Sequence, residues 1–569
     1  MLPSSDAPPA PDRSRQLKRY GPFAAILVVI LVGVVIAVAS GGGKDDDAAT
    51  TTTAADAAGG PAGAVSFSQA KAKGLKVTFN AACDQSTGKV RLPYFFAPEC
   101  YADVADNGGA TTPGVTADAI TVVVYVSPET DPVIDYITAA IKNDDTNAQV
   151  KATWQGYADM YNALYQLYGR KLVLKFLDGS GGAQDEVAAR ADAVKAAEQF
   201  HAFAVIGGPT LTSAFADELA ARKVVCIGCT AGAPSFYEKR KPYLFNVTSN
   251  TEQITRHVVE YMAKKLAGRK ATFAGSAALK ATDRKFGYLW IESNDDSKSQ
   301  AELFKSSLAA KGITLAASVP YTLEPARLQE QATSAITKMK QAGVTTVVFS
   351  GDPVAPSSFT KEATAQGYFP EWLLGPQVLV DTTAFARTYD QRQWAHAFGP
   401  SPLAMRTDPT KADAYRLYQW FTGETPPAKD TNTVMMPSIS LFAYAVQAAG
   451  PDLTPETFRQ GLFSRGPSSG TITQPSISFG RHGLWPYDDY NGVDDTTEIW
   501  WNPDATGPDE IRKQGKGMWE YVDGGARHLP GKWSTADSKA FDPDGAVTIL
   551  DAPPTAEQPP DYPSPAAGG

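Results

Sequence analysis

Histidine and cysteine are scarce in this chain, with five and four copies among 569 residues. The histidines do not have the H-x3–5-H spacing of a zinc site, and the C-x-x-C motif over 226–229 has no second copy. The H-E-x-x-H motif of metalloproteases and the phosphate-binding motif G-x-x-x-x-G-K-S/T are absent. We therefore expect no metal ion and no cofactor.

Positive charge is also in short supply. Lys and Arg total 52 against 61 Asp and Glu, which gives a formal net charge of −9. No stripe of basic residues with interleaved aromatics offsets this deficit, so nucleic acid is not an expected partner. The hydrophobic content of 43% and charged content of 20% are those of a folded globular protein. The length requires two or more domains.

One long apolar run occurs, over residues 23–39, which contains no charged or polar side chain. Basic residues precede the run within 1–22 and acidic residues follow it, which predicts a cytoplasmic N-terminus and places the rest of the chain outside the cytoplasm. We expect a single-pass anchor in the cell membrane. The alternative is a signal segment that is cleaved near Ala39, where the small-x-small pattern of a cleavage site occurs.

An exported chain meets oxidising conditions, so its four cysteines are candidates for disulfides, with three possible connectivities. Residues 40–64 read as a disordered linker, and residues 65–118 as an irregular module that contains Cys83 and Cys100. Pairing these two would stabilise the module by about 3 kcal/mol. The second pair, Cys226 and Cys229, follows a predicted strand and leads into a loop rather than a helix, which argues against a thioredoxin-like redox site.

From residue 119 onward, continuous apolar strands alternate with amphipathic helices. Examples are AITVVVYV (119–126), KLVLKFLD (171–178), FAVIGG (203–208) and VVCIG (224–228). This rhythm predicts parallel sheets with helices on both faces. The alternation breaks off near residue 250 and then starts again, which predicts one lobe over 119–250 and a second lobe over 251–376. Residues 377–469 are predicted to form a crossover and the helices that complete both lobes.

The remaining residues differ in composition. Residues 470–535 are rich in Trp, Tyr, Gly and Asp and read as an aromatic C-terminal extension. Residues 536–569 form a Pro-rich tail that we expect to lack fixed structure towards its end. The adjacent carboxylates Asp144 and Asp145 fall in a predicted loop and are interpreted as surface charge.

Small polar loops follow several of the predicted strands, such as GGPTLTS (207–213), CTAGAP (229–234), SNDDSKS (293–299), SGDPVAPSS (350–358) and GPQVLVD (375–381). In open parallel sheets, ligands bind outside the carboxyl ends of the strands, where helix N-termini offer free backbone N–H groups. A single such loop is usually no more than a helix cap. Five loops from two lobes predict a shared ligand cleft.

The same segments carry a resemblance to a known family. IGGPTLTSAFADELAARKVVCIGCTAGAP (206–234), then YLFNVTSN, FGYLWIESND, VTTVVFSGD and WLLGPQVLVD, resemble the type I periplasmic binding proteins of the leucine/isoleucine/valine-binding group. These are receptors for ABC importers of amino acids, amides and urea-like solutes. The resemblance covers roughly 117–450 and implies two α/β lobes, joined by three crossovers, that close on a ligand by hinge motion.

The resemblance also implies site residues by position. In lobe 1 they are Pro209, Thr210, Leu211, Thr212, Thr230, Ala231 and Gly232, and in lobe 2 they are Asp296, Ser297, Ser350, Asp352 and Gln377. Where the family has an acidic residue that pairs with the ligand ammonium, this chain has Gln377. A neutral amide cannot neutralise an ammonium. The ligand is therefore an amino acid only if Asp296 or Asp352 takes over; an amide, a urea-like solute or a carboxylate without an ammonium fits equally.

The leading hypothesis is an exported, non-catalytic receptor that delivers a small polar solute to an ABC transporter permease. A membrane-anchored sensor that signals without transport is a second hypothesis. A third is an exported hydrolase, which would need a nucleophile and a base that the fold brings together. The Cys226–Cys229 disulfide is predicted to shape the TAG turn (230–232) beside the cleft.

Overall fold

The fold is described by a computed structural model that covers residues 60–128, 130–139, 141, 143–209 and 211–568. The predicted membrane segment over 23–39, the residues before it and most of the linker lie outside the described residues, as does Thr210. In the described part of the chain, no helix has both the length and the apolar character needed to cross a membrane.

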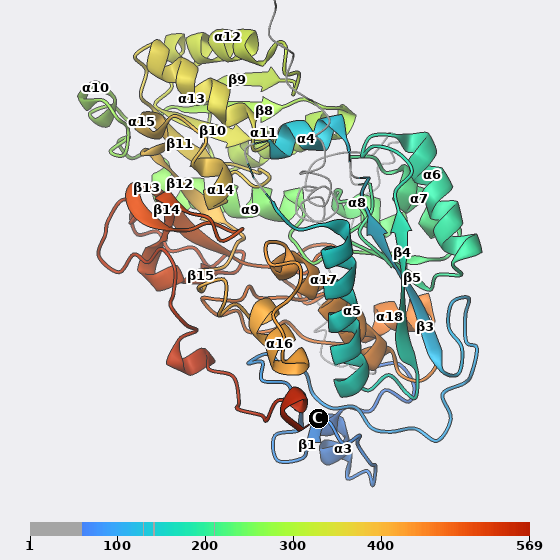
Figure 1. The fold of residues 1–569 in the computed structure, drawn as a ribbon. Coiled ribbons are helices and arrows are strands. Elements are labelled where there is room, and N and C mark those ends of the chain that lie inside the picture. The colour runs from blue at the N-terminus through green and yellow to red at the C-terminus, as the bar shows by residue number, and fades with distance from the viewer. Residues whose placement is uncertain (1–59, 129, 140, 142, 210, 569) are drawn as a thin grey trace, which may run out of the picture.

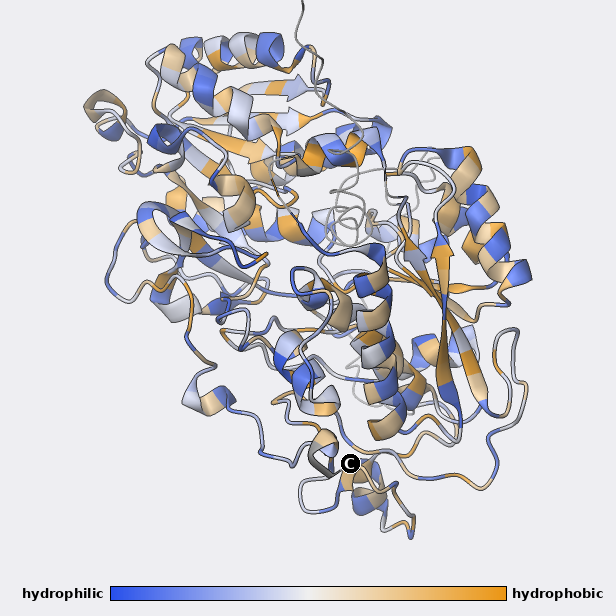
Figure 2. Cartoon of the chain, in the orientation of Figure 1, coloured by the Kyte–Doolittle hydropathy of each residue, from blue (hydrophilic) through white to orange (hydrophobic). Residues whose placement is uncertain are grey.

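Lobe 1 is built on a five-stranded parallel sheet with the strand order β4-β3-β5-β6-β7. Its strands are β3 (Ala119–Val126), β4 (Lys171–Asp178), β5 (Ala204–Ile206), β6 (Val225–Ile227) and β7 (Leu244–Phe245). The run of β-branched residues in β3 is buried from Val122 onward, as expected for a central parallel strand covered on both faces. Figure 2 shows these strands as an apolar layer between helices of mixed polarity.

Helices cover both faces of the lobe 1 sheet (Figure 1). Those between the strands are α5 (Asn147–Leu164), α6 (Glu186–Val194), α7 (Ala214–Ala221) and α8 (Pro234–Glu238). Three later helices join the same hydrophobic core: α16 (Asp413–Thr422), α17 (Asn432–Ala449) and α18 (Pro455–Phe463). Phe442 of α17 and Phe458 of α18, for example, pack against Phe203 at the start of β5.

Lobe 2 contains a larger mixed sheet with the order β14-β13-β12-β11-β10-β8-β9. The parallel strands are β8 (Phe286–Ile291), β9 (Leu315–Tyr321), β10 (Thr346–Ser350), β11 (Glu371–Leu374) and β12 (Ala397–Ser401). The helices of this lobe are α9 (Thr251–Tyr261), α10 (Ala277–Lys280), α11 (Asp295–Ala309), α12 (Leu328–Gln341), α13 (Ala355–Ala365), α14 (Thr383–Ala386) and α15 (Gln391–Trp394). The larger ones bury apolar faces in two separate clusters: α12 and α13 in one, α9 and α11 in the other.

The aromatic segment over 470–535 is part of this sheet rather than an extension outside the lobes. Strand β13 (Thr496–Pro508) pairs antiparallel with β12, and β14 (Gln514–Tyr521) and the short β15 (Arg527–His528) pair with β13. Trp501 and Trp519 come from neighbouring strands and lie 5.2 Å apart in the lobe 2 core. The reason for the aromatic content is therefore burial.

Among the described residues, the chain passes between the lobes at three places: after β7, after β12 and after α18. The first and third passages lie side by side, because Asn246 N donates to Tyr490 O and Gly492 N donates to Asn246 O, each at 2.9 Å. The prediction of a two-lobed α/β fold is confirmed.

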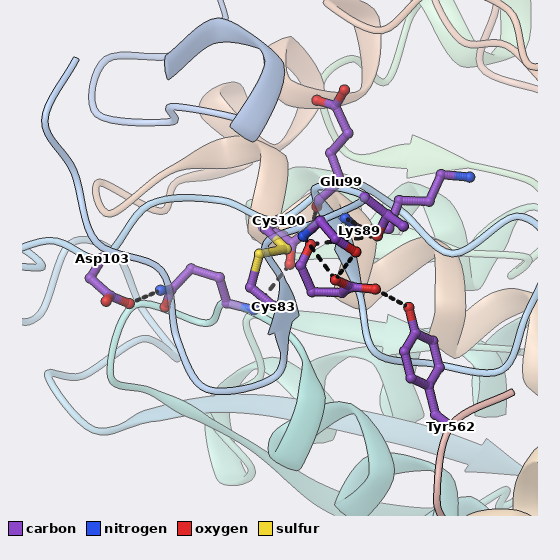
Figure 3. The surroundings of a disulfide bond; sticks show 11 residues. Cys83, Lys89, Glu99, Cys100, Asp103 and Tyr562 are labelled. Carbon is purple, nitrogen blue, oxygen red and sulfur yellow. Dashed lines mark hydrogen bonds between the residues drawn. A yellow bond between two sulfur atoms is a disulfide. The ribbon is translucent and has the colours of Figure 1, made fainter. Parts of the chain in front are cut away.

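The N-terminal module packs onto lobe 1. It comprises α3 (Phe67–Lys73) and the two-residue strands β1 (Cys83–Asp84) and β2 (Lys89–Val90), and a disulfide joins Cys83 to Cys100. Figure 3 shows this disulfide beside Glu99. Two glutamines of lobe 1 hold the module: Gln447 Nε2 donates to Glu99 O at 3.0 Å, and Gln166 Nε2 donates to Asp103 Oδ1 at 2.7 Å.

Two predictions about polar segments are wrong. The Pro-rich tail follows a fixed path: Val547 pairs with Tyr521, Tyr562 O accepts from Trp420 Nε1 at 2.9 Å, and the Tyr562 hydroxyl donates to Asp84 at 2.8 Å (Figure 3). Asp145 is not surface charge either. It is 5% exposed and accepts hydrogen bonds from the backbone N–H groups of residues 429–431, which precede α17. Backbone N–H groups at a helix start lack partners within the helix, and the Asp145 carboxylate accepts hydrogen bonds from those that lead into α17.

Candidate ligand cleft between the lobes

The loop between β5 and α7 packs closely against the loop that follows β6. Gly207 has a left-handed backbone (φ 78°), and its N–H donates to Ile227 O at 3.0 Å. A Cβ atom on Gly208 would lie 2.9 Å from the Phe215 ring and 3.1 Å from Cys229 O, so this position requires glycine. Thr212 is buried, and its Oγ1 accepts from Ala214 N at 3.1 Å in the first turn of α7. Thr212 therefore fixes the chain just before α7, at the carboxyl edge of the sheet.

The second lobe 1 loop begins at the C-x-x-C motif. Cys226 lies in β6, and a disulfide joins it to Cys229. Thr230 and Ala231 follow and are buried. Tyr237 of α8 donates from its hydroxyl to Thr230 O at 3.5 Å and accepts from Asn491 Nδ2 at 3.2 Å. Because Asn491 belongs to the third crossover, this loop is connected to the hinge as well as to the sheet.

In lobe 2, the predicted residues Asp296 and Ser297 lie in the first turn of α11. The Ser297 hydroxyl accepts from Ser293 N and Asn294 N at 2.9 and 3.0 Å and donates to Asn294 O at 2.7 Å, so it closes a capping box with Asn294. Asp296 N donates to Asn294 Oδ1 at 3.1 Å in the same turn. Burial raises the pKa of the Asp296 carboxyl to about 6, whereas the positive charges of Lys239 and Arg240, the basic edge of α8 in lobe 1, favour its charged form.

Ser350 and Asp352 follow β10, but their polar atoms are used within lobe 2. Ser350 Oγ donates to Pro376 O. Asp352 Oδ2 accepts from the Tyr321 hydroxyl at 2.6 Å, and its Oδ1 accepts from Val354 N and Ala355 N at 2.8 and 2.9 Å. Burial raises the pKa of Asp352, and the hydrogen bond from Tyr321 opposes that shift. The Asp352 carboxylate therefore holds the backbone N–H groups at the start of α13.

Gln377 also serves its own loop. Its Oε1 accepts from Val380 N at 2.7 Å, and its side chain hydrogen-bonds Asp381, a buried carboxyl whose Oδ2 accepts from Ser401 Oγ at 2.5 Å. The residue that replaces the family's acidic position therefore supports the turn over 377–381.

Two of the predicted residues meet in a small polar cavity. Ser297 and Ser350 line a space of about 20 Å³ together with Thr251, Thr255, Gln300 and Pro376. Thr255 Oγ1 and Gln300 Oε1 are buried there, with no hydrogen-bond partner among the described residues. The size and polarity are those of a site for a single water molecule.

Residues of both lobes meet in one hydrophobic cluster. Ile134 and Ile137 of α4 (Pro132–Thr138), which follows β3 of lobe 1, are buried in the lobe 2 core cluster, and Leu211 and Ala231 of the two lobe 1 loops pack into the same cluster. Helix α4 was not predicted from the sequence, although Asp131 followed by Pro132 is the N-cap and N1 signal that marks its start.

The run GPSSG over 466–470 matches the G-x-S-x-G pattern of hydrolases. It lies in an irregular segment after α18 rather than at a strand-to-helix turn, and Ser468 Oγ accepts from Ile477 N at 2.8 Å. Among the residues that the structure describes, no group of three or more His, Cys, Asp or Glu side chains is arranged to hold a metal ion.

Comparisons with solved structures give relatives with low sequence identity. A solute-binding protein of an ABC transporter from R. palustris, in complex with 4-hydroxybenzoate, is 14% identical, with a TM-score of 0.49 over 73% of this chain and 99% of that chain. A fatty acid ABC transporter substrate-binding protein from Thermomonospora curvata is 15% identical, with a TM-score of 0.47 over 74% and 95%. The branched-chain amino acid transporter substrate-binding protein LivJ from Streptococcus pneumoniae, in complex with isoleucine, is 17% identical, with a TM-score of 0.46 over 71% and 100%.

No curated protein matches the chain. A family model described as "periplasmic binding protein" matches residues 133–483. This range is more than half of the chain; it begins in α4 and ends in the third crossover, so it includes most of lobe 1, the parallel strands of lobe 2 and the cleft loops. The chain belongs to the periplasmic binding protein family.

Proposed function

We propose that the protein captures a small polar solute between its lobes, outside the cytoplasm, and delivers it to the permease of an ABC importer without converting it chemically. The observation that carries the proposal is that the lobe 1 loops, which follow the carboxyl ends of β5 and β6, meet lobe 2 in one hydrophobic cluster. Leu211 and Ala231 provide this contact from lobe 1.

The proposed ligand lies near Asp296 and the basic edge of α8. Asp296, Asp352 and Gln377 are the three side chains that could bind a ligand ammonium. Asp352 and Gln377 already form hydrogen bonds within lobe 2. Asp296 remains, and Lys239 and Arg240 of lobe 1 already act on it. An α-amino acid therefore requires Asp296 as the partner of its ammonium, whereas an amide, a urea-like solute or a carboxylate without an ammonium does not.

We further propose that residues 23–39 anchor the protein in the cell membrane with its C-terminal bulk outside. The support is the apolar run and its charge asymmetry. Mass measurement of the N-terminus of the protein isolated from its own membrane tests this, because cleavage near Ala39 would remove the run. Retention of residues 1–39 supports the anchor, and their loss contradicts it.

Isothermal titration and thermal shift of the full chain in mild detergent test the proposed ligand class. The panel contains amino acids, their amides, urea and small hydroxy acids. We expect saturable binding of one class together with a higher melting temperature, because a ligand that binds only the folded state stabilises it. No binding by any member of the panel contradicts the proposal.

A further inference from the structure

A second and larger cavity lies beside the crossover over 403–412. Its volume is about 330 Å³, within the range of small-molecule sites. None of the residues that were predicted to line the cleft borders it. Its walls come from lobe 2 (Leu379, Phe385 and Tyr521), from the crossover (Leu403 and Arg406) and from the start of α17 in lobe 1 (Val434). The cavity is thus an interlobe space that is separate from the proposed cleft.

Three carboxylates border the cavity, and each already has partners. Asp413 pairs with Arg416 at 2.6 Å, and Asp430 pairs with Arg512 at 2.8 Å. Glu510 accepts hydrogen bonds from Thr383 N and Ala384 N, both at 2.9 Å, at the N-terminus of α14. The negative charge of the wall is therefore compensated by neighbouring donors.

Arg406 is different, because part of its guanidinium has no acceptor. Nη2 donates to Thr383 Oγ1 and Pro508 O at 3.1 Å, and Nε lies 3.5 Å from Glu510 Oε1. Nη1 is buried without a hydrogen-bond partner among the described residues. A buried charged donor without an acceptor is costly, so a carboxylate that Nη1 reaches by a rotation of the guanidinium towards the cavity gains more here than at the surface. Lys411 also borders the cavity, is exposed and forms no ion pair with a described residue.

We propose that this cavity is a second ligand site, which binds a small carboxylate with an apolar body. The carboxylate accepts a hydrogen bond from Arg406, and the apolar body lies against Leu379, Phe385 and Val434. The site is independent of the proposed capture of a polar solute. Because its walls include both lobes and a crossover, its ligand contacts the parts that must move relative to one another during closure.

Titration of the full chain at neutral pH with hexanoate, hexanamide and hexylamine tests the proposal. We expect hexanoate to bind and hexanamide to bind about tenfold more weakly, because the amide loses one charge-assisted hydrogen bond. Hexylamine should not compete with hexanoate. In Arg406→Gln, hexanoate and hexanamide should bind equally. Val434→Phe should abolish hexanoate binding, because the ring occupies the cavity.

Arg481→Gln is the matched control, since Arg481 pairs with Asp488 at the surface and borders neither this cavity nor the cleft; it should bind hexanoate like the parent. Asp296→Asn reports on the cleft. The proposal is overturned if the parent binds hexanoate and hexanamide equally, binds neither, prefers hexylamine, or keeps hexanoate binding in Val434→Phe. Loss of hexanoate binding in Asp296→Asn but not in Val434→Phe would place the ligand in the cleft and also overturn it. If Arg406→Gln fails to fold, the preference of the parent protein for hexanoate over hexanamide and hexylamine still decides the outcome.

Discussion

Arg284 and Glu371 form a fully enclosed ion pair in lobe 2, with side chains 3% and 0% exposed. Arg284 Nε and Nη2 donate to the two carboxylate oxygens at 2.8 and 2.9 Å. Thr346 Oγ1 and Phe273 N donate to the same carboxylate, at 2.5 and 3.0 Å. The pair therefore joins β11 to β10 and to the segment that precedes β8.

We expect Glu371→Gln to lower the free energy of unfolding by about 3–5 kcal/mol, because it leaves the Arg284 charge buried without a partner. The double variant Arg284→Met, Glu371→Leu should recover most of this loss, since it removes both charges. Chemical denaturation monitored by tryptophan fluorescence provides the measurement. A single variant as stable as the parent would show that water reaches this pair.

The hinge contains a buried carboxyl pair, Asp489 and Asp494, which are hydrogen-bonded to each other. Burial raises the pKa of Asp494 to about 7 and the pKa of Asp489 well above its ordinary value of 3.8. The folded state therefore holds protons that the unfolded state releases, so this pair loses stabilising free energy as pH rises from about 4 to about 7. His257 opposes the trend, because burial lowers its pKa to about 4.

The contribution of Asp489 can be isolated by comparison. Relative to the parent, Asp489→Asn should gain about 1.4 kcal/mol of unfolding free energy per pH unit from about pH 4 up to the raised pKa of Asp489 in the folded state, since the amide replaces the protonated acid and does not titrate. The opposing effect of His257 cancels in this difference. Asp488→Asn is the control, because Asp488 pairs with Arg481 at the surface. A difference that is independent of pH would contradict the prediction.

The positive charge at the end of α8, in lobe 1, contributes to the pKa of Asp296 in lobe 2. Burial raises the pKa of Asp296 to about 6, and Lys239 lowers it. Lys239→Met should therefore raise this pKa further, as measured by carboxyl carbon chemical shifts. Lys241→Met is the matched control, since Lys241 pairs with Glu238. Equal effects of the two variants would mean that the lobes do not meet at Asp296.

The two disulfides should differ in what they stabilise. Replacement of Cys83 and Cys100 by serine should lower the free energy of unfolding by about 3 kcal/mol, the expected contribution of a loop of this size. Replacement of Cys226 and Cys229 by serine removes a much smaller ring, so stability should change less, while solute binding in the cleft should weaken. Titration with the cleft ligand and denaturation of both double variants test this contrast. Parent-like binding without Cys226–Cys229 would show that the disulfide does not shape the turn.

Strands such as β3, β5 and β6 could be predicted from sequence because each lies in a continuous apolar run, whereas the short strands β7 and β12 were not predicted. The partners of β13 could not be predicted either. Its pairing with β12 joins residues about a hundred positions apart, and nothing in TTEIWWN distinguishes an added edge of lobe 2 from a separate hairpin. A strand can be recognised from its own residues, whereas the strand that it pairs with cannot be read from them when that partner is far away in the sequence.

The same limit applies to the site. The loops were placed correctly at strand ends, but the use of each polar atom depends on distant partners. Asp352 is occupied by the Tyr321 hydroxyl, and Tyr321 ends a strand 31 residues earlier. Gln377 is occupied by its own turn. Helix α4 was missed because its seven residues are too few for a periodic pattern, although Asp131 and Pro132 mark its start.

The passage of the chain back and forth between the lobes has a consequence for synthesis on the ribosome. The lobe 1 core includes Phe203 and Phe245 but also Phe442, Phe458 and Tyr490. Most of lobe 2 is therefore translated before the last side chains of the lobe 1 core exist. The lobe 2 core in turn includes Trp501 and Trp519, which are translated later still. Neither lobe can finish folding while it emerges, so the nascent chain must carry two incomplete cores until its C-terminal third has been made.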